Sequence, residues 1–338
     1  MSEALLQIND LHVSFATYAG KVQAVRGVDL TLEKGEILAV VGESGCGKSV
    51  TAQTVMRLNP SPPCMIEKGS VLFDGTDLVK LKEHEMRPLR GKRIGMIFQD
   101  PMTSLDPTKR VGEQIMEAIR RHEKVAKKEA FARSVEMLEL VGISDPVRRM
   151  KQFPHEFSGG MRQRAMIAMS LVCRPELLIA DEPTTALDVT IQAQILDLLL
   201  ELRQKLDTSI LIITHDMGVV ADIADRVMIM YAGMVVETGT ADEIFYSPRH
   251  PYTWGLLESI PKPGNRGATR LVPIEGTPPD LLNPPVGCPF ADRCEYALAI
   301  CREEMPERFA CSDSHNVRCW LRHELAPKVK NPITGGED

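Results

Sequence analysis

One segment near the N-terminus restricts the fold more than any other part of the chain. Residues 42–49 read Gly-Glu-Ser-Gly-Cys-Gly-Lys-Ser and fit the pattern G-x-x-x-x-G-K-[ST] at every position. An apolar run, residues 37–41, precedes the segment, and a helical pattern, residues 50–58, follows it. In this strand–turn–helix setting, backbone N–H groups point at phosphate oxygens and the helix N-terminus adds partial positive charge. The pattern predicts an α/β P-loop NTPase core with a mainly parallel sheet.

The residue types of this loop match the chemistry of a nucleotide and its metal. Lys48 is expected to reach the β- and γ-phosphates, and Ser49 is expected to bind Mg²⁺. A plain glycine turn would leave both of these side chains unexplained. The residues expected to bind the nucleotide are Gly42, Ser44, Gly45, Cys46, Gly47, Lys48, Ser49 and Val50.

A second apolar run, residues 177–180, ends in Asp181 and Glu182. Carboxylates at the carboxyl end of a parallel strand lie where such sheets bind ligands. Asp181 is expected to hold Mg²⁺, directly or through water, and Glu182 to polarise the attacking water as a general base. Many strands run into acidic turns, so this interpretation depends on the P-loop.

Composition and hydropathy limit the class of protein. The 338 residues include 43% hydrophobic and 25% charged residues, as in soluble globular proteins. The formal net charge of -6 argues against bulk binding of nucleic acid, so no nucleic-acid partner is expected. Neither an apolar stretch of roughly 20 residues nor a secretory signal is present. The chain is therefore expected in the cytosol, with any membrane contact made through a partner.

The order of patterns predicts a cassette followed by an appendage. Residues 1–247 are expected to form the cassette, with a helical subdomain at about 111–165 in which Phe131, Val135 and Leu138 make an apolar face. The runs 6–15 and 71–73 are expected as antiparallel strands flanking the nucleotide strand. Residues 248–326 are expected to form a Pro-rich connection and a small Cys-rich C-terminal domain, and residues 327–338 a frayed tail.

A family resemblance follows from residues 157–164. They read Phe-Ser-Gly-Gly-Met-Arg-Gln-Arg and resemble the signature motif of ABC ATPases, usually L-S-G-G-Q. Ser158 and the two glycines would open a helix with exposed N–H groups, which makes a second anion site. The resemblance implies a head-to-tail dimer, in which Ser158, Gly159, Gly160 and Met161 cover the nucleotide at the partner's P-loop. It also implies an ABC cassette with an antiparallel β subdomain and a helical subdomain, binding ATP.

Further landmarks of ABC ATPases occur in the expected order. Gln99 resembles the Q-loop glutamine that contacts Mg²⁺ and water, and Asp188, in Ala-Leu-Asp, resembles the D-loop at the dimer interface. His215 resembles the switch histidine that contacts the γ-phosphate. With Glu182 and Gln99 it completes the catalytic set that the resemblance implies. Tyr18 is the expected adenine-stacking aromatic, with Phe15 as the alternative.

Two segments narrow the resemblance to one group of importers. Residues 98–107 and 249–253 are similar to those of the oligopeptide, dipeptide and nickel importer ATPases, and the similarity extends along the whole chain. It implies an ATPase that powers import of peptides, with nickel or another small solute as the alternative. The implied location is the cytoplasmic face of the cell membrane, as a peripheral protein. The cargo stays open, because selectivity lies with a binding protein and the channel.

The resemblance also implies a set of partners. They are a sister ABC ATPase, two transmembrane permease subunits and an extracytoplasmic substrate-binding protein. Met161 stands where the signature commonly has Gln, a departure similar to one of two paralogous ATPases in this group. It favours a heterodimer, although helix N–H groups rather than this side chain would bind the phosphate.

Five of the eight cysteines crowd into residues 288–319. In a reducing cytosol such a group favours a metal or cluster site over disulfides. Thiolates suit zinc and iron–sulfur clusters, and the spacing does not decide between them. The importer resemblance implies a [4Fe–4S] cluster held by Cys288, Cys294, Cys301 and Cys319, with Cys311 as a substitute. Zinc and free buried thiols are the alternatives.

Other classes of protein fit less well. A DNA-repair ABC ATPase would separate the P-loop from the signature by a long coiled coil, but only residues 50–157 intervene. A translation-factor ATPase would carry two cassettes. A small-molecule kinase leaves the signature and His215 unexplained, and a non-enzymatic regulatory module leaves Glu182 and His215 unexplained.

Overall fold

The computed structural model describes residues 4–100, 104–185, 188–260 and 273–336. The chain divides into two compact units, each of which is built from three separate segments of the sequence. The first unit comprises Met1–Leu5, Leu32–Glu36 and Lys80–Ile213, and the second comprises Leu6–Thr31, Ile37–Val79 and Thr214–Asp338. The boundaries of cassette, appendage and tail expected from the sequence stay predictions.

Three parallel strands form the centre of the first unit. They are β6 (Ile94–Ile97), β7 (Leu177–Asp181) and β8 (Ser209–Thr214), with β7 paired to both neighbours. Every residue of the three strands is buried. Continuous apolar runs rich in Ile and Leu suit such strands, which are covered on both faces. Because the strands are parallel, their carboxyl ends share one edge, where Asp181 ends β7.

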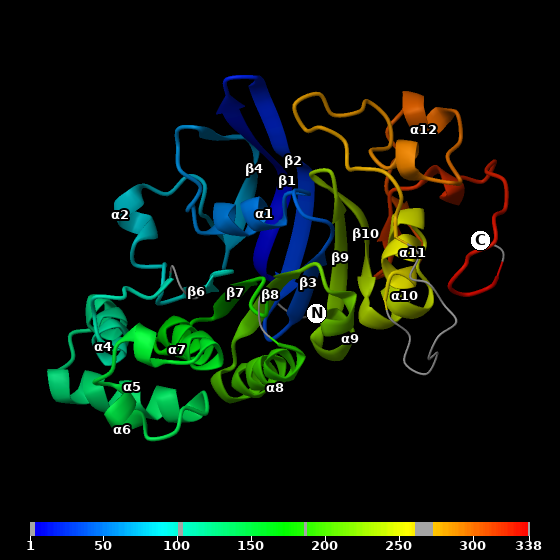
Figure 1. Cartoon of the computed structure of the whole chain (residues 1–338). Helices are drawn as coiled ribbons and strands as arrows, with labels where there is room; N and C mark the ends of the chain where they lie inside the picture. The colour runs from blue at the N-terminus through cyan, green and yellow to red at the C-terminus, as the bar shows by residue number, and fades with distance from the viewer. Residues whose placement is uncertain (1–3, 101–103, 186–187, 261–272, 337–338) are drawn as a thin grey trace. The chain divides into compact units, whose positions relative to one another are not determined.

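Helices make up most of the rest of the first unit (Figure 1). Its helical elements are α2 (Glu83–Met86), α4 (Val111–His122), α5 (Lys127–Leu140), α6 (Pro146–Arg149), η1 (Pro154–Glu156), α7 (Gly159–Leu171) and α8 (Val189–Leu206). The apolar face expected on α5 is partly wrong. Leu138 is buried, but Phe131 and Val135 are only half-buried. Ala130, Ser134 and Met137 complete the buried face, since a helical stripe shifts by about 100° per residue and neighbouring positions compete for the core.

The main sheet of the second unit holds the strand that precedes the P-loop. β3 (Ile37–Val41) pairs in parallel with β9 (Arg226–Tyr231), and β9 pairs antiparallel with β10 (Met234–Thr240). Two short C-terminal strands, β12 (Asn316–Val317) and β11 (Phe309–Ala310), extend the sheet beyond β10. The C-terminal segment is thus joined to the nucleotide-binding part of the unit by backbone hydrogen bonds.

A second sheet in this unit is antiparallel and has the order β2-β1-β4-β5. Its strands are β1 (Ala4–Thr17), β2 (Gly20–Glu33), β4 (Cys64–Phe73) and β5 (Thr76–Asp77). The expected antiparallel strands therefore exist, and β1 and β4 pair with each other. They lie in a separate sheet from the nucleotide strand, as the antiparallel β subdomain implied by the family resemblance requires, and the Asp74-Gly75 turn joins β4 to β5 within it.

Helices α1 (Lys48–Val55), α9 (Met217–Ile223), α10 (Ala241–Tyr246) and α11 (Pro251–Glu258) belong to the second unit. Figure 1 shows α10 and α11 beside β10, with the orange and red C-terminal segment following them. That segment carries η2 (Ala291–Arg293), α12 (Ile300–Glu303) and η3 (Trp320–Arg322).

A small core anchors the C-terminal segment. Trp254 of α11 packs with Val317, Cys319 and Leu321. Within the tail expected from residue 327, most of residues 327–336 are exposed, but Asn331 is fully buried and its amide donates to the Pro248 carbonyl at 2.9 Å. A side-chain hydrogen bond to a remote carbonyl leaves no trace in local composition.

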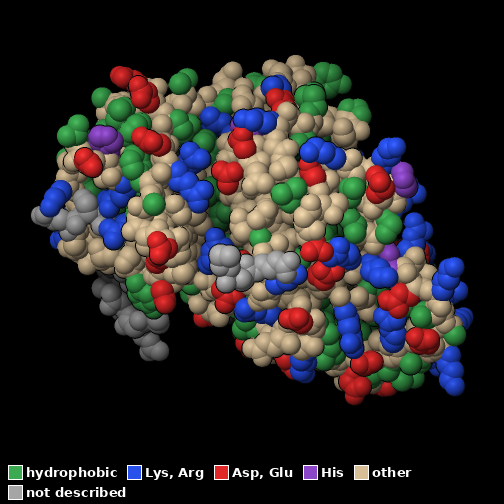
Figure 2. Space-filling model, turned by 180° about the vertical axis from the view of Figure 1, so that it is seen from behind, with side chains coloured by type: hydrophobic (Ala, Val, Ile, Leu, Met, Phe, Trp, Pro, Cys, Tyr) green, Lys and Arg blue, Asp and Glu red, His purple; other side chains and the backbone are tan. Residues whose placement is uncertain are grey.

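The surface shows mixed charge. Figure 2 shows Lys and Arg side chains interspersed with Asp and Glu on the face that it presents. In the part of the chain that the structure describes, no helix is both long and apolar enough to cross a membrane.

Candidate active site

The P-loop connects β3 to α1, and two of its glycines are required by close backbone approaches. At Gly42 an added Cβ would lie 2.1 Å from the Met230 carbonyl oxygen, and at Gly47 it would lie 2.3 Å from that of Ala24. Gly47 also has φ 96°, a left-handed conformation that disfavours side chains. The loop is therefore packed tightly on β9 and β2, which fixes its backbone.

Lys48 is the buried cation of this loop. Its Nζ donates to the carbonyl oxygens of Gly42 at 2.7 Å and Glu43 at 2.9 Å. The ammonium group is thus held inside the curve of the loop, where phosphates bind in P-loop proteins. The neighbouring Cys46 is buried, and burial raises the pKa of its thiol. Ser44 and Gly45 are exposed at the tip of the loop.

Glu43 is the residue of the loop that sequence reasoning missed. Its backbone N–H donates to the Tyr252 hydroxyl at 2.9 Å, and its carboxylate forms a two-pronged ion pair with Arg293. The hydrogen bonds that Arg293 donates to the Glu43 carboxylate raise the pKa of Arg293 above its ordinary value. The variable positions of the motif pattern carry no signal for these contacts, which join residues 209 and 250 positions apart.

The acidic residues lie in the first unit with Gln99. Asp181 is buried at the end of β7, and Glu182 follows with φ 49°. One carboxylate oxygen of Glu182 accepts hydrogen bonds from the Gln99 amide at 2.9 Å and the Thr185 hydroxyl at 2.8 Å. The Glu182 N–H donates to the Ile213 carbonyl at 2.9 Å. The carboxylate is therefore oriented by Gln99 and Thr185, and the backbone of Glu182 is held by Ile213.

The signature segment opens α7 as the sequence predicts. Ser158 is the N-cap, and its hydroxyl accepts a hydrogen bond from the Met161 N–H at 3.3 Å. Gly159 has no neighbour within 4 Å of an added Cβ, which leaves the helix N-terminus open. Further along α7, the buried Gln163 donates to the Pro183 carbonyl at 2.5 Å. The signature helix is thus tied to the loop that follows Glu182.

The predicted residues fall into two groups, one in each unit. The second unit holds the P-loop, Tyr18 and His215, and the first holds Gln99, Asp181, Glu182, the signature and Asp188. Tyr18 is exposed at the turn between β1 and β2, and Phe15 is half-buried. His215 is exposed between β8 and α9. The structure brings together Gln99 with Glu182, and Lys48 with the rest of the P-loop.

Asp188 caps α8, with its carboxylate accepting from the Ile191 N–H at 2.9 Å. The other two D-loop residues, Ala186 and Leu187, lie outside the described residues, as do residues 101–103 of the Q-loop region.

The four cysteines expected to hold a cluster lie near one another. Burial raises the pKa of Cys288 to about 12 and that of Cys294 to about 11, and the neighbouring thiols add to both shifts. Burial also raises the pKa of Cys319, with Cys288 and Cys294 contributing. Cys311 is exposed. Among the described residues, however, no group of three or more His, Cys, Asp or Glu side chains has the geometry of a metal site. The predicted cluster therefore gains no support from this geometry.

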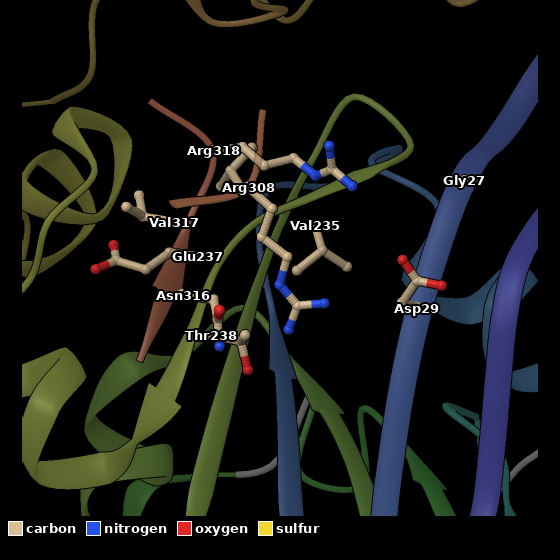
Figure 3. Close-up of a pocket in the computed structure, with 10 residues that line it drawn as sticks. Gly27, Asp29, Val235, Glu237, Thr238, Arg308, Asn316, Val317 and Arg318 are labelled. Carbon is tan, nitrogen blue, oxygen red and sulfur yellow. The ribbon is translucent and has the colours of Figure 1, made fainter. Parts of the chain in front are cut away.

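A separate pocket opens at β10 and β12. Figure 3 shows it lined by Arg308 and Arg318 of the C-terminal segment and by Asp29 of β2. None of its lining residues is a predicted site residue, so this pocket is not the nucleotide site.

Comparisons with known proteins agree with this geometry. A family described as ABC transporter matches residues 25–185, and one described as oligopeptide/dipeptide transporter, C-terminal region, matches residues 236–301. The oligopeptide transport ATP-binding protein OppD of Bacillus subtilis is 62% identical over 328 residues, which cover 97% of this chain and 92% of that protein. The dipeptide transport ATP-binding protein DppD of the same organism is 57% identical over 324 residues, 96% of each chain.

A solved dimeric bacterial ABC transporter cassette aligns with a TM-score of 0.63 at 25% identity, covering 70% of this chain and 98% of its own. The fold, the P-loop and the signature together define an ABC-type nucleotide-binding cassette. The chain belongs to the ABC transporter ATPases, in the group of oligopeptide and dipeptide transport ATP-binding proteins. The sequence predictions of the family, the fold class and a transport-coupled ATPase are thereby confirmed.

Proposed function

We propose that this chain hydrolyses ATP to drive the import of peptides through a membrane channel. The match of its C-terminal region to the oligopeptide/dipeptide family is the observation that carries the proposal, since it extends beyond the part that all ABC cassettes share. High identity to two peptide-transport ATP-binding proteins along nearly the whole chain supports it. Nickel is the alternative cargo.

The proposed chemistry assigns one role to each group. The P-loop N–H groups and Lys48 bind and neutralise the phosphates, and Glu182 polarises the attacking water. His215 contacts the γ-phosphate. The orientation of the Glu182 carboxylate by Gln99 supports this assignment, because a base must be held in a fixed geometry.

Mg²⁺ is the metal that such a nucleotide requires. The residues that would hold it are Ser49, Gln99 and Asp181, whose hydroxyl, amide and carboxylate oxygens are the donor types that this hard cation prefers. When bound, the metal neutralises charge on the β- and γ-phosphates.

We place the chain at the cytoplasmic face of the membrane, as half of an ATPase dimer. The open helix N-terminus at Ser158 supports a role for residues 158–161 in covering the partner's nucleotide. The expected partner is a sister ATPase, because Met161 departs from the usual signature. Two permeases and an extracytoplasmic binding protein complete the importer.

For the appendage we propose a structural [4Fe–4S] cluster on Cys288, Cys294, Cys301 and Cys319. What supports the proposal is the chemistry of the donor set, since thiolates are the ligands that such clusters take, and not a metal-site geometry among the described residues. Anaerobically purified protein should contain iron and absorb broadly in the visible range. Zinc without iron, or neither metal with titratable thiols, would each contradict the cluster.

The test of cargo uses the complete transporter in vesicles with ATP inside and the binding protein outside. Labelled di- and oligopeptides should accumulate only with ATP, and Glu182→Gln should abolish their uptake. Accumulation of labelled nickel without that of peptides would overturn the peptide proposal while leaving the ATPase assignment intact.

A further inference from the structure

The P-loop carries one carboxylate, and the C-terminal segment neutralises it. Arg293 ends η2, 250 residues beyond Glu43 in the sequence. Its Nη1 donates to Glu43 Oε2 at 2.6 Å, and its Nη2 donates to Oε1 at 2.9 Å. Parallel charge-assisted bonds of this kind are strong and fix the orientation of both groups.

Arg293 is itself held in place on all sides. Its side chain is 5% exposed. It donates further hydrogen bonds to the Ile274 and Glu275 carbonyls at 3.2 and 2.9 Å, and to the Tyr231 hydroxyl at 3.1 Å. Its guanidinium lies 5.6 Å from the centre of the Tyr231 ring and 5.8 Å from that of Phe290. An arginine so fully bonded acts as a rigid support.

The backbone of Glu43 is held by the same cluster. Tyr252 accepts the Glu43 N–H, and the Tyr252 ring packs on Tyr231 and Phe290 with ring centres 4.6 and 5.3 Å apart. Glu43 is therefore fixed through both its side chain and its peptide group. Such aromatic clusters add rigidity beyond the area that they bury.

The chain ahead of Arg293 makes further contacts with the nucleotide-binding part of this unit. The Leu281 carbonyl accepts from the Gln23 N–H at 2.9 Å, and the Pro285 carbonyl accepts from Arg26 Nη2 at 3.1 Å. A pocket beside the P-loop is lined both by Ser44 and Cys46 and by Pro278, Pro279 and Leu281. The appendage thus contacts the loop at several points.

We propose that Arg293 is a positioning residue for ATP, through which the C-terminal segment sets the affinity of the P-loop. The inference rests on the proposed binding of ATP at this loop. Arg293 acts in two ways: it fixes the backbone at Glu43, and it neutralises a carboxylate that would otherwise repel the anionic triphosphate.

The two effects predict how the variants rank in their affinity for ATP. Arg293→Gln leaves Glu43 charged and unpaired beside the phosphates, so the loss of ATP affinity should be largest, about tenfold or more. Glu43→Gln removes the repelling charge, and Arg293 keeps its carbonyl and tyrosine partners. The double variant Glu43→Gln/Arg293→Gln should therefore bind ATP better than Arg293→Gln alone. Arg293→Lys should lie between the wild type and Arg293→Gln.

The experiment titrates full-length purified chain with Mg-ATP, and measures KM and kcat of the assembled transporter. KM for ATP should rise in Arg293→Gln with a much smaller change in kcat. Arg302→Gln is the matched control, because Arg302 lies in the same segment and pairs only at 3.5 Å with the exposed Asp292. Its KM should equal that of the wild type.

Two results would overturn the proposal. One is an unchanged KM in Arg293→Gln; the other is a double variant no better than Arg293→Gln, which indicates a purely structural contact. If Arg293→Gln fails to fold, Arg293→Lys decides, since a KM for ATP equal to that of the wild type in this variant also excludes positioning. Loss of peptide uptake with normal ATP binding in the wild type would instead count against the proposed cargo.

Discussion

Glu182 shows how much of the role of a single residue can be predicted from the sequence. Its place after an apolar strand marks it as a candidate base, and the structure adds how it is held. Its backbone has φ 49°, and Gln99, 83 positions away, orients its carboxylate. Left-handed backbone at a non-glycine residue costs about 1–3 kcal/mol and is typical of functional sites. Glu43 has no such local signal, and only its contacts single it out.

The first prediction concerns Glu182. Glu182→Gln keeps the shape of the side chain and its hydrogen bonds but removes the base, so ATP hydrolysis should fall by about 10²–10⁴-fold while ATP still binds. Turnover of the assembled transporter and nucleotide titrations of the purified chain measure the two quantities. Glu201→Gln is the control, because Glu201 pairs only with Lys205 on the exposed face of α8. Unchanged turnover in Glu182→Gln would contradict its role as base.

At the scale of elements, three helices begin at a residue whose side chain caps the helix N-terminus. Ser158 caps α7, Asp188 caps α8, and Thr240 caps α10 with Glu243 in a capping box. Such caps satisfy N–H groups that a helix leaves open and are readable from sequence. The capping pattern does not predict that Glu243 makes a second set of hydrogen bonds. Its carboxylate also accepts hydrogen bonds from the hydroxyls of Ser312 and Ser314, at 2.5 and 2.8 Å.

The second prediction follows from the pKa of Glu243. Burial would raise this pKa, but the bonds from Ser312, Thr240 and Ser314 outweigh burial and lower it from 4.5 to about 2. A carboxylate with a depressed pKa stabilises the fold fully above pH 4.5, and this contribution disappears as the pH falls towards 2. Glu243→Gln should lose about 1 kcal/mol of unfolding free energy at neutral pH.

Urea unfolding of the wild type and the variant at several pH values between 2 and 7 provides the measurement. The difference between them should shrink as the pH falls from 4.5 to 2. Asp242→Asn is the control, since Asp242 is exposed in the same first turn of α10. If the difference in unfolding free energy between the wild type and Glu243→Gln does not change with pH, the hydrogen bonds do not depend on the charge of the Glu243 carboxylate.

For the second unit as a whole, the C-terminal segment is part of the nucleotide-binding unit rather than an independent attachment. β12 pairs with β10, and Trp254 joins α11 to Cys319 and Leu321. The Trp254 ring N–H donates to the Pro248 carbonyl at 2.9 Å, so its polar edge is satisfied in the core.

The third prediction concerns this core. Trp254→Ala removes a fully buried ring and should destabilise the fold by about 3–5 kcal/mol. Denaturant unfolding measures the loss, and in protein stripped of iron and zinc the rate of thiol labelling at Cys319 should rise because its cover is removed. Leu325→Ala, at a side chain that is 88% exposed, should change neither quantity. A Trp254→Ala protein with unaltered labelling at Cys319 would show that the ring does not hold the segment.

Local patterns were enough to predict the P-loop, the acidic strand end and the helix that Ser158 opens, whereas the class of protein followed from the resemblance to ABC ATPases. Each of the local patterns depends on residue types at short spacing, which chemistry and backbone geometry restrict directly. The register of β1 against β4, the buried face of α5 and the burial of Asn331 were not predicted. Each depends on which distant surface an element packs against.

The residues of the nucleotide loop and the contacts that surround it differ in the same way. The glycine spacing and Lys48 are readable from the loop itself, because any chain that wraps a phosphate needs small residues and a cation there. Their roles follow from the order of residues. The contacts of Glu43 with Arg293 and Tyr252 arise because folding brings the C-terminal segment, 250 residues away, against the loop. No local pattern carries that information, since a long-range ion pair depends on the path of the whole chain between its partners.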